Sequence, residues 1–155
     1  MGKEFRLEQL LPLIQETLAQ GKTFQFSPRG VSMQPMLIQG RDTVTLAPVD
    51  RELKKYDLPL YRRDNGAFVL HRIVKVGDTL TCIGDNQYEL EPGIRRDQVV
   101  AVVVAFTHGG ESVAVTDLRY QIYCRLWHWS RGLRKLLIRA KGFARRVVRK
   151  LRTRG

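Results

Sequence analysis

Short β-rich runs separated by turn residues fill the sequence from residue 23 to about residue 116. The runs that read as strands are 42–47, 58–63, 67–76, 79–83, 99–106 and 112–117. Asp64-Asn65-Gly66, between the second and third runs, is a strong hairpin signal. No helical stretch separates the runs, which disfavours parallel βαβ units. We therefore predict a mostly β fold, an antiparallel folded sheet or barrel, for residues 23–117.

A helix is predicted on each side of this β region. In residues 4–20 apolar side chains recur at helical spacing, Gly21 marks the end, and Pro12 either starts or bends the helix. Residues 120–151 return to the helical period. The expected organisation is a short N-terminal helix in 1–22, a β domain in 23–117 and a long basic amphipathic helix in 118–155.

Positive charge is concentrated in the C-terminal segment. Residues 1–117 contain 14 Lys/Arg against 15 Asp/Glu, whereas residues 118–155 contain 13 Lys/Arg and no acidic residue. An anionic partner is therefore expected to meet this segment.

The apolar side of the predicted C-terminal helix suits the interface of an anionic membrane, which we expect it to contact peripherally through residues 120–151. Its stripe includes Ile122, Leu126 and Trp129, and we place Trp127 on the same side. One alternative is a helix packed on the β domain with a solvated basic rim. Nucleic-acid binding is a second alternative, which charge allows, but the apolar stripe is too continuous for a simple phosphate contact surface.

Several classes of protein are disfavoured by what the sequence lacks. Cys82 and Cys124 are far apart and the three histidines are scattered, so we expect no metal, disulfide or cofactor. The first 20 residues contain acids and Pro12, unlike a secretory signal, and the longest charge-free apolar stretch, 99–106, falls far short of the ~20 residues of a membrane span. The expected location is cytoplasmic, either soluble or peripheral at the membrane.

Ser32 in "GVSMQPML" is the first candidate for chemistry. A serine nucleophile needs a tight turn that exposes its hydroxyl and nearby N–H groups, and Gly30 and Pro35 suit such a turn. The same residues also suit an ordinary loop, and the local sequence alone favours that interpretation.

His71 is the odd residue in the apolar run "FVLHRIV". A histidine there is partly desolvated and hence biased towards the neutral form that a general base needs. The alternative is a core histidine hydrogen-bonded to the backbone.

A Gly-Asp-Asn turn (residues 84–86) and two glutamates follow in "IGDNQYELE". Such a turn is usually only structural. However, runs 67–76 and 79–83 are joined by only Gly77 and Asp78, so we expect them to pair as a hairpin. A carboxylate after the second run would then be within reach of His71.

Together, "GVSMQPML", "RDTVTL", "FVLHRIV", "IGDNQ" and "VVAVVVAF" resemble, over residues 26–106, the type I signal peptidases and the related self-cleaving LexA-type repressors. The resemblance implies their folded antiparallel sheet and a Ser32 nucleophile. "LHRIV" is similar to the endoplasmic-reticulum branch, which implies His71 as the base; Lys75 is then a solvated or strand-end charge. The acid lies at Asp85 or in the "ELE" pair, and we favour Asp85 over Glu91.

Further expectations follow from this resemblance. Many signal peptidases have serine two residues before the nucleophile, where this chain has Gly30, so the oxyanion hole would rest on backbone N–H groups, chiefly that of Ser32. "VSM" and "FVL" would flank a shallow apolar cleft that includes Met33 and Val69.

The function predicted is a signal-peptidase-like serine endopeptidase that cleaves a leader or precursor peptide. One alternative is a self-cleaving regulator of the LexA/UmuD type, for which "LAQG" (18–21) is the small-residue site upstream of the β domain. Another is a catalytically silent module that binds a membrane or a partner.

Overall fold

The computed structural model, which describes residues 7–133, contains two antiparallel β-sheets, and the ten-residue strand β8 (Val99–His108) is the centre of the larger one. One edge of β8 pairs with β2, and its other edge pairs first with β3 and then with β9. The other strands of this sheet are β1 (Phe24–Phe26), β2 (Val44–Ala47), β3 (Pro59–Arg62), β4 (Phe68–Leu70) and β9 (Glu111–Ala114).

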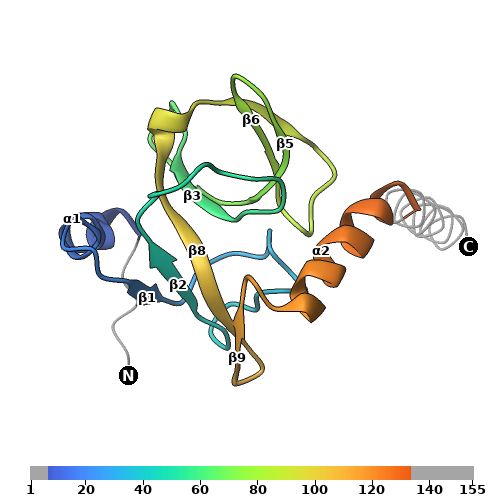
Figure 1. The fold of residues 1–155 in the computed structure, drawn as a ribbon, viewed down its shortest axis with the longest axis horizontal. Coiled ribbons are helices and arrows are strands. Elements are labelled where there is room, and N and C mark those ends of the chain that lie inside the picture. Colours follow the sequence, from blue (N-terminus) through green and yellow to red (C-terminus); the bar gives the residue numbers. More distant parts are fainter. Residues whose placement is uncertain (1–6, 134–155) are drawn as a thin grey trace, which may run out of the picture.

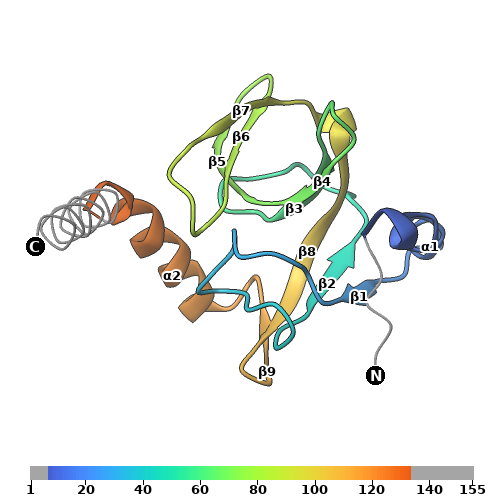
Figure 2. The same ribbon diagram turned by 180° about the vertical axis from the view of Figure 1, so that it is seen from behind.

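The smaller sheet consists of β5 (Arg72–Val76), β6 (Leu80–Ile83) and β7 (Glu91–Ile94), and a short 3₁₀ helix η1 (Arg96–Gln98) leads from it into β8. The two sheets share a buried apolar cluster, to which the larger sheet contributes Tyr61 and Val102 and the smaller one Ile73 and Leu80. Figures 1 and 2 show the strands of the smaller sheet curling over β3 and β4, beside the upper part of β8.

The mostly β, antiparallel fold predicted from the sequence is confirmed, with one strand divided. The predicted run 67–76 is broken at His71, so that β4 belongs to the larger sheet and β5 to the smaller one. The hairpin across Gly77 and Asp78 is present as β5 and β6. Strands β1 and β7 were not predicted, because β1 has only three residues and β7 contains Pro92 and Gly93, which are rare in strands.

Two helices lie on opposite sides of β8 (Figures 1 and 2). Helix α1 (Leu7–Ala19) contains Pro12 in its interior and buries Ile14 and Leu18 in the core beneath this sheet. Helix α2 (Leu118–Trp129) starts at Asp117, whose carboxylate accepts a hydrogen bond from the Arg119 N–H at 2.7 Å. Neither of these described helices has the length and apolar character needed to cross a bilayer. The predicted continuation of the C-terminal helix beyond residue 133 lies outside the described residues.

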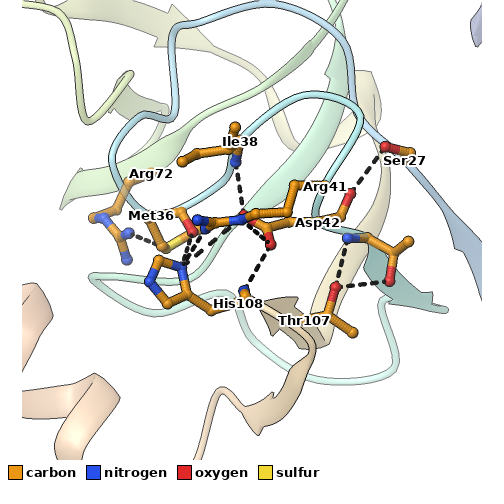
Figure 3. Close-up of polar contacts among 10 residues, drawn as sticks. Ser27, Met36, Ile38, Arg41, Asp42, Arg72, Thr107 and His108 are labelled. Carbon is orange, nitrogen blue, oxygen red and sulfur yellow. Dashed lines mark hydrogen bonds and ion pairs between the residues drawn. The ribbon is translucent and has the colours of Figure 1, made fainter.

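Residues 27–42, which we call the serine loop, connect β1 to β2 and are closed at their base by Asp42. Ser27 Oγ donates to the Asp42 backbone carbonyl at 2.9 Å. The fully buried Asp42 carboxylate accepts from the N–H groups of Ile38 and Gly109 at 2.8 and 2.9 Å and from Arg41 at 2.7 Å (Figure 3). The hydrogen bond from Arg41 lowers the pKa of Asp42 to about 2. This carboxylate therefore joins the serine loop to the turn between β8 and β9.

Replacing Asp42 by Asn tests that connection. At pH 7 the variant is expected to lose about 1–3 kcal/mol of unfolding free energy, because a charge-assisted acceptor of several hydrogen bonds is removed. The folded pKa lies below the unfolded value of 3.8, so the contribution of Asp42 is fully present above about pH 5 and declines as pH falls towards 2. In urea unfolding, the difference in unfolding free energy between wild type and Asp42→Asn should therefore become smaller as the pH falls from 6 to 2.5. Asp50→Asn, at an exposed site, is the control. A difference in unfolding free energy between wild type and Asp42→Asn that stays constant with pH contradicts the stabilising role of the Asp42 charge.

Candidate active site

Ser32 belongs to the serine loop, and the Gly-Asp-Asn turn of residues 84–86 holds its backbone. The Asn86 N–H donates to the Ser32 carbonyl at 2.8 Å, and the Asn86 side-chain amide donates to the Val31 carbonyl at 3.1 Å. Gly84 makes this approach possible, because a Cβ at residue 84 would lie only 2.6 Å from the Ser32 carbonyl oxygen. The turn therefore fixes the backbone of the candidate nucleophile.

The N–H of Ser32 is unengaged, as an oxyanion donor must be. It donates to no other group among residues 7–133, and neither does the Ser32 hydroxyl. Gly30, in contrast, has its N–H bound to Gln39 Oε1 at 2.8 Å and adopts φ +95°, a conformation that favours glycine. The arrangement leaves the Ser32 N–H to stabilise an oxyanion, whereas the N–H of Gly30 is occupied.

His71 lies where the chain passes from the larger sheet to the smaller one, and only 3% of its surface is exposed. Its Nδ1 is 3.4 Å from Glu91 Oε2 and 3.3 Å from Tyr61 Oη. Burial lowers the pKa of His71, and the charge of Glu91 opposes that shift only in part. The imidazole is therefore neutral at pH 7, and a proton on Nδ1 leaves Nε2 able to act as a base.

Glu91, from β7, is held in place against His71 by two residues of the neighbouring β3 region. Tyr61 Oη donates to Glu91 Oε2 at 2.7 Å, and Arg63 makes a two-point ion pair with the carboxylate, at 2.5 and 2.7 Å. Burial by itself raises the pKa of Glu91, but the hydrogen bonds from Arg63 and Tyr61 outweigh it and lower the pKa. A charged Glu91 is thus in position to orient His71 and to stabilise its protonated form.

Asp85, the other candidate acid, lies against Arg72. The Arg72 guanidinium donates to both carboxylate oxygens, at 2.8 and 2.7 Å, and Tyr123 Oη adds a third hydrogen bond at 3.0 Å. Both side chains of this ion pair are almost completely buried. The expectation favoured Asp85 over Glu91, whereas the structure gives the contact with His71 Nδ1 to Glu91.

Ser32 and His71 line the same cavity, which has a volume of about 220 Å³. Met33 and Val69, expected at an apolar cleft, line it as well. The cavity is less apolar than expected, because three polar side chains also reach it: Arg29, Arg63 and Gln87. No group of three His, Cys, Asp or Glu side chains that could hold a metal occurs within residues 7–133.

Three residues of the site were not singled out from the sequence: Tyr61, Arg63 and Arg72. The first two come just before the predicted Asp64-Asn65-Gly66 turn, and Tyr61 is paired with Val69 in the register of β3 and β4. This register follows from the hairpin signal, and it could have indicated that Tyr61 lies near His71, which is two residues after Val69. Arg72 was visible in "LHRIV", but its role depends on Asp85 and on contacts from α2.

Comparison of the sequence with protein-family models finds no matching family. Comparison with curated proteins finds no significant match.

Substitution of the two acids should separate a fully buried structural carboxylate, Asp85, from the partly exposed carboxylate of Glu91, which contacts the histidine. Asp85→Asn leaves the sealed Arg72 charge without its counterion, so we expect a loss of about 3–5 kcal/mol in unfolding free energy. Glu91→Gln should cost clearly less, about 1–2 kcal/mol, because Arg63 is 37% exposed and can turn to water. Urea unfolding at pH 7 measures both. Equal losses, or a larger loss in Glu91→Gln, would contradict the division.

Proposed function

We propose that this protein is a serine endopeptidase, similar to signal peptidases of the endoplasmic-reticulum type, that cleaves a leader or precursor peptide. Ser32 is the nucleophile, His71 the general base and Glu91 the carboxylate that orients the base. The observation that carries the proposal is that Ser32 and His71 line one cavity while Glu91 contacts the Nδ1 side of the same imidazole.

The chemistry divides into acylation and hydrolysis. Ser32 Oγ attacks the carbonyl carbon of the scissile peptide bond as His71 Nε2 takes the hydroxyl proton, and the Ser32 N–H stabilises the oxyanion. The proton then passes from His71 to the leaving amine, and the C–N bond breaks to leave an ester on Ser32. Water, deprotonated by His71, hydrolyses that ester and restores the serine. Glu91 remains charged throughout and stabilises the imidazolium.

The dimensions and lining of the cavity favour a short stretch of peptide as substrate. At about 220 Å³ the cavity is smaller than the sites that enclose drug-sized ligands. It can take one or two small side chains of an extended peptide, and Met33 and Val69 offer them apolar contact. The antiparallel fold also agrees with the likeness to signal peptidases and LexA-type domains that the motifs imply.

The self-cleaving alternative has less support than cleavage of another chain. The small-residue segment 18–21 closes helix α1, where Leu18 is buried and its carbonyl accepts from the Gly21 N–H at 2.9 Å. A serine peptidase needs its substrate extended, so this segment would first have to leave the core.

Labelling with a fluorophosphonate probe tests the nucleophile. We expect wild-type protein to be labelled covalently, Ser32→Ala to lose labelling completely, and His71→Ala to react at least a hundredfold more slowly. Ser112→Ala, at an exposed position on β9, is the matched control and should label like wild type. Labelling that survives Ser32→Ala would disprove the assignment. A folded wild-type protein that is never labelled would instead favour the catalytically silent module.

The pH dependence of labelling tests the base. Because burial lowers the pKa of His71, its neutral form predominates above a pH that lies below the ordinary 6.5, and the rate should fall as pH drops through that value. Glu91→Gln removes a charge that raises this pKa, so its midpoint should move further down and its plateau rate should decrease. Rate constants between pH 4.5 and 9 give both quantities. Lys75→Gln, an exposed site on β5, should leave the profile unchanged, whereas a rate that rises only at alkaline pH would exclude His71 as the base.

A further inference from the structure

Helix α2 has an inner face that belongs to the protein core. Tyr120 and Cys124 are buried, and Trp127 Nε1 donates to the Asp85 carbonyl at 2.9 Å. The sequence pattern predicts Trp127 beside Trp129 on the apolar side of the helix. The structure corrects this: Trp127 is directed to the Gly-Asp-Asn turn, and Trp129 is 83% exposed.

The opposite face of α2 is apolar and uncovered. Among residues 7–133, ten large hydrophobic side chains are exposed, and half of them lie in the 16 residues from 118 to 133. These five are Leu118 (72% exposed), Ile122 (48%), Leu126 (60%), Trp129 (83%) and Leu133 (59%). At 100° per residue the four that belong to α2 fall within a sector of about 80°, so they form one stripe along the helix, and Leu133 lies just beyond its last residue, Trp129. We call this stripe the outer face of α2.

Arginines border the outer face on both sides. At the same helical period, exposed Arg119 lies on one flank and exposed Arg125 on the other, each about 60° from the centre of the stripe. Long basic side chains at these positions can reach lipid headgroups while the apolar side chains between them enter the acyl region. No acidic residue occurs anywhere in 118–155, which carries 13 Lys/Arg.

An apolar cavity of about 300 Å³ lies next to the outer face, on the flank where Arg119 is located. Its lining comes from the serine loop, from β8 and β9 and from α2, and includes Met36, Phe106, Val113 and Tyr123. The cavity extends the uncovered apolar surface beyond the helix, with a cationic side chain at its margin.

We propose that the outer face of α2 lies in the interface of an anionic lipid bilayer, with the helix parallel to the membrane plane. The apolar stripe supplies burial and the bordering arginines supply attraction to anionic headgroups. A second copy of the chain is a poor occupant, because pairing two such faces would bring the bordering arginines of both copies together. A nucleic acid would satisfy the arginines but leave the five hydrophobic side chains in water. This inference does not depend on peptidase activity.

The two tryptophans of the chain, one on each face of α2, allow a direct test. Full-length Trp127→Phe retains only outer Trp129, and Trp129→Phe retains only inner Trp127. Each is mixed with vesicles that contain bromine-labelled phosphatidylcholine, either alone or with 30% phosphatidylglycerol. We expect Trp129 emission to shift to the blue and to be quenched at least twofold by the anionic vesicles only, and Trp127 emission to stay nearly unchanged. If Trp127→Phe does not fold, quenching of wild type that is lost in Trp129→Phe gives the same answer.

A second pair of variants tests the apolar contribution without changing charge. Leu126→Gln/Trp129→Gln should weaken binding to anionic vesicles about tenfold or more, because two side chains no longer enter the bilayer. The matched control, Leu13→Gln/Val76→Gln, changes two exposed hydrophobic residues elsewhere and should bind like wild type. The proposal fails if Trp129 is not quenched, if neutral vesicles quench it equally, or if the two double variants bind alike. It also fails if the chain binds duplex DNA but no vesicle, or if the Gln variant only dissociates a dimer.

Discussion

The buried ion pair between Arg72 and Asp85 is the interaction on which the rest of the site depends. Both side chains are at most 2% exposed, so each charge needs the other. Burial alone would lower the pKa of Arg72, but Asp85 keeps it well above its ordinary value. The remaining guanidinium hydrogens are also used, by Tyr120 Oη and Cys124 Sγ at 2.8 and 2.9 Å. A pair so completely satisfied holds one geometry, because any displacement leaves a buried charge without a partner.

This ion pair connects three parts of the chain that are distant in sequence. Arg72 directly follows His71, so it fixes the backbone of the candidate base at the junction between the sheets. Asp85 stands between Gly84, which leaves room for the Ser32 carbonyl, and Asn86, whose N–H donates to it. Arg72 also contacts Met36 Sδ of the serine loop at 3.0 Å. Helix α2 closes the arrangement from outside. The inner face of α2 is consequently part of the scaffold of the site. A partner that binds the outer face of α2 therefore lies close to Ser32 and His71.

The sequence predicts most of the strands, the two helices and the grouping of Ser32 with His71. It predicts less well which side chains contact His71 and which face of α2 packs against the core. Alternating patterns and a hairpin signal are local, so they identify strands from neighbouring residues alone. Choosing between Asp85 and Glu91 requires knowing that β7 pairs with β6, which Pro92 and Gly93 conceal. Assigning the two tryptophans of α2 failed for a related reason. When a helix has apolar residues on two faces, the sequence period identifies the helix but not the face that packs against the core.

The two carboxylates differ in burial as their proposed tasks require. Asp85 is almost completely buried and hydrogen-bonded to Arg72, which suits a structural counterion. A change of charge next to it would cost much free energy, because water cannot solvate the new charge. Glu91 keeps 23% of its side chain exposed and shares its charge with a partly exposed Arg63. Tyr61 is buried and its pKa is raised, so it remains a hydroxyl donor beside both Glu91 and His71. When the imidazole gains a proton, this half-open network can accommodate the new charge, whereas the closed Arg72–Asp85 pair could not do so without losing the contacts that hold Ser32.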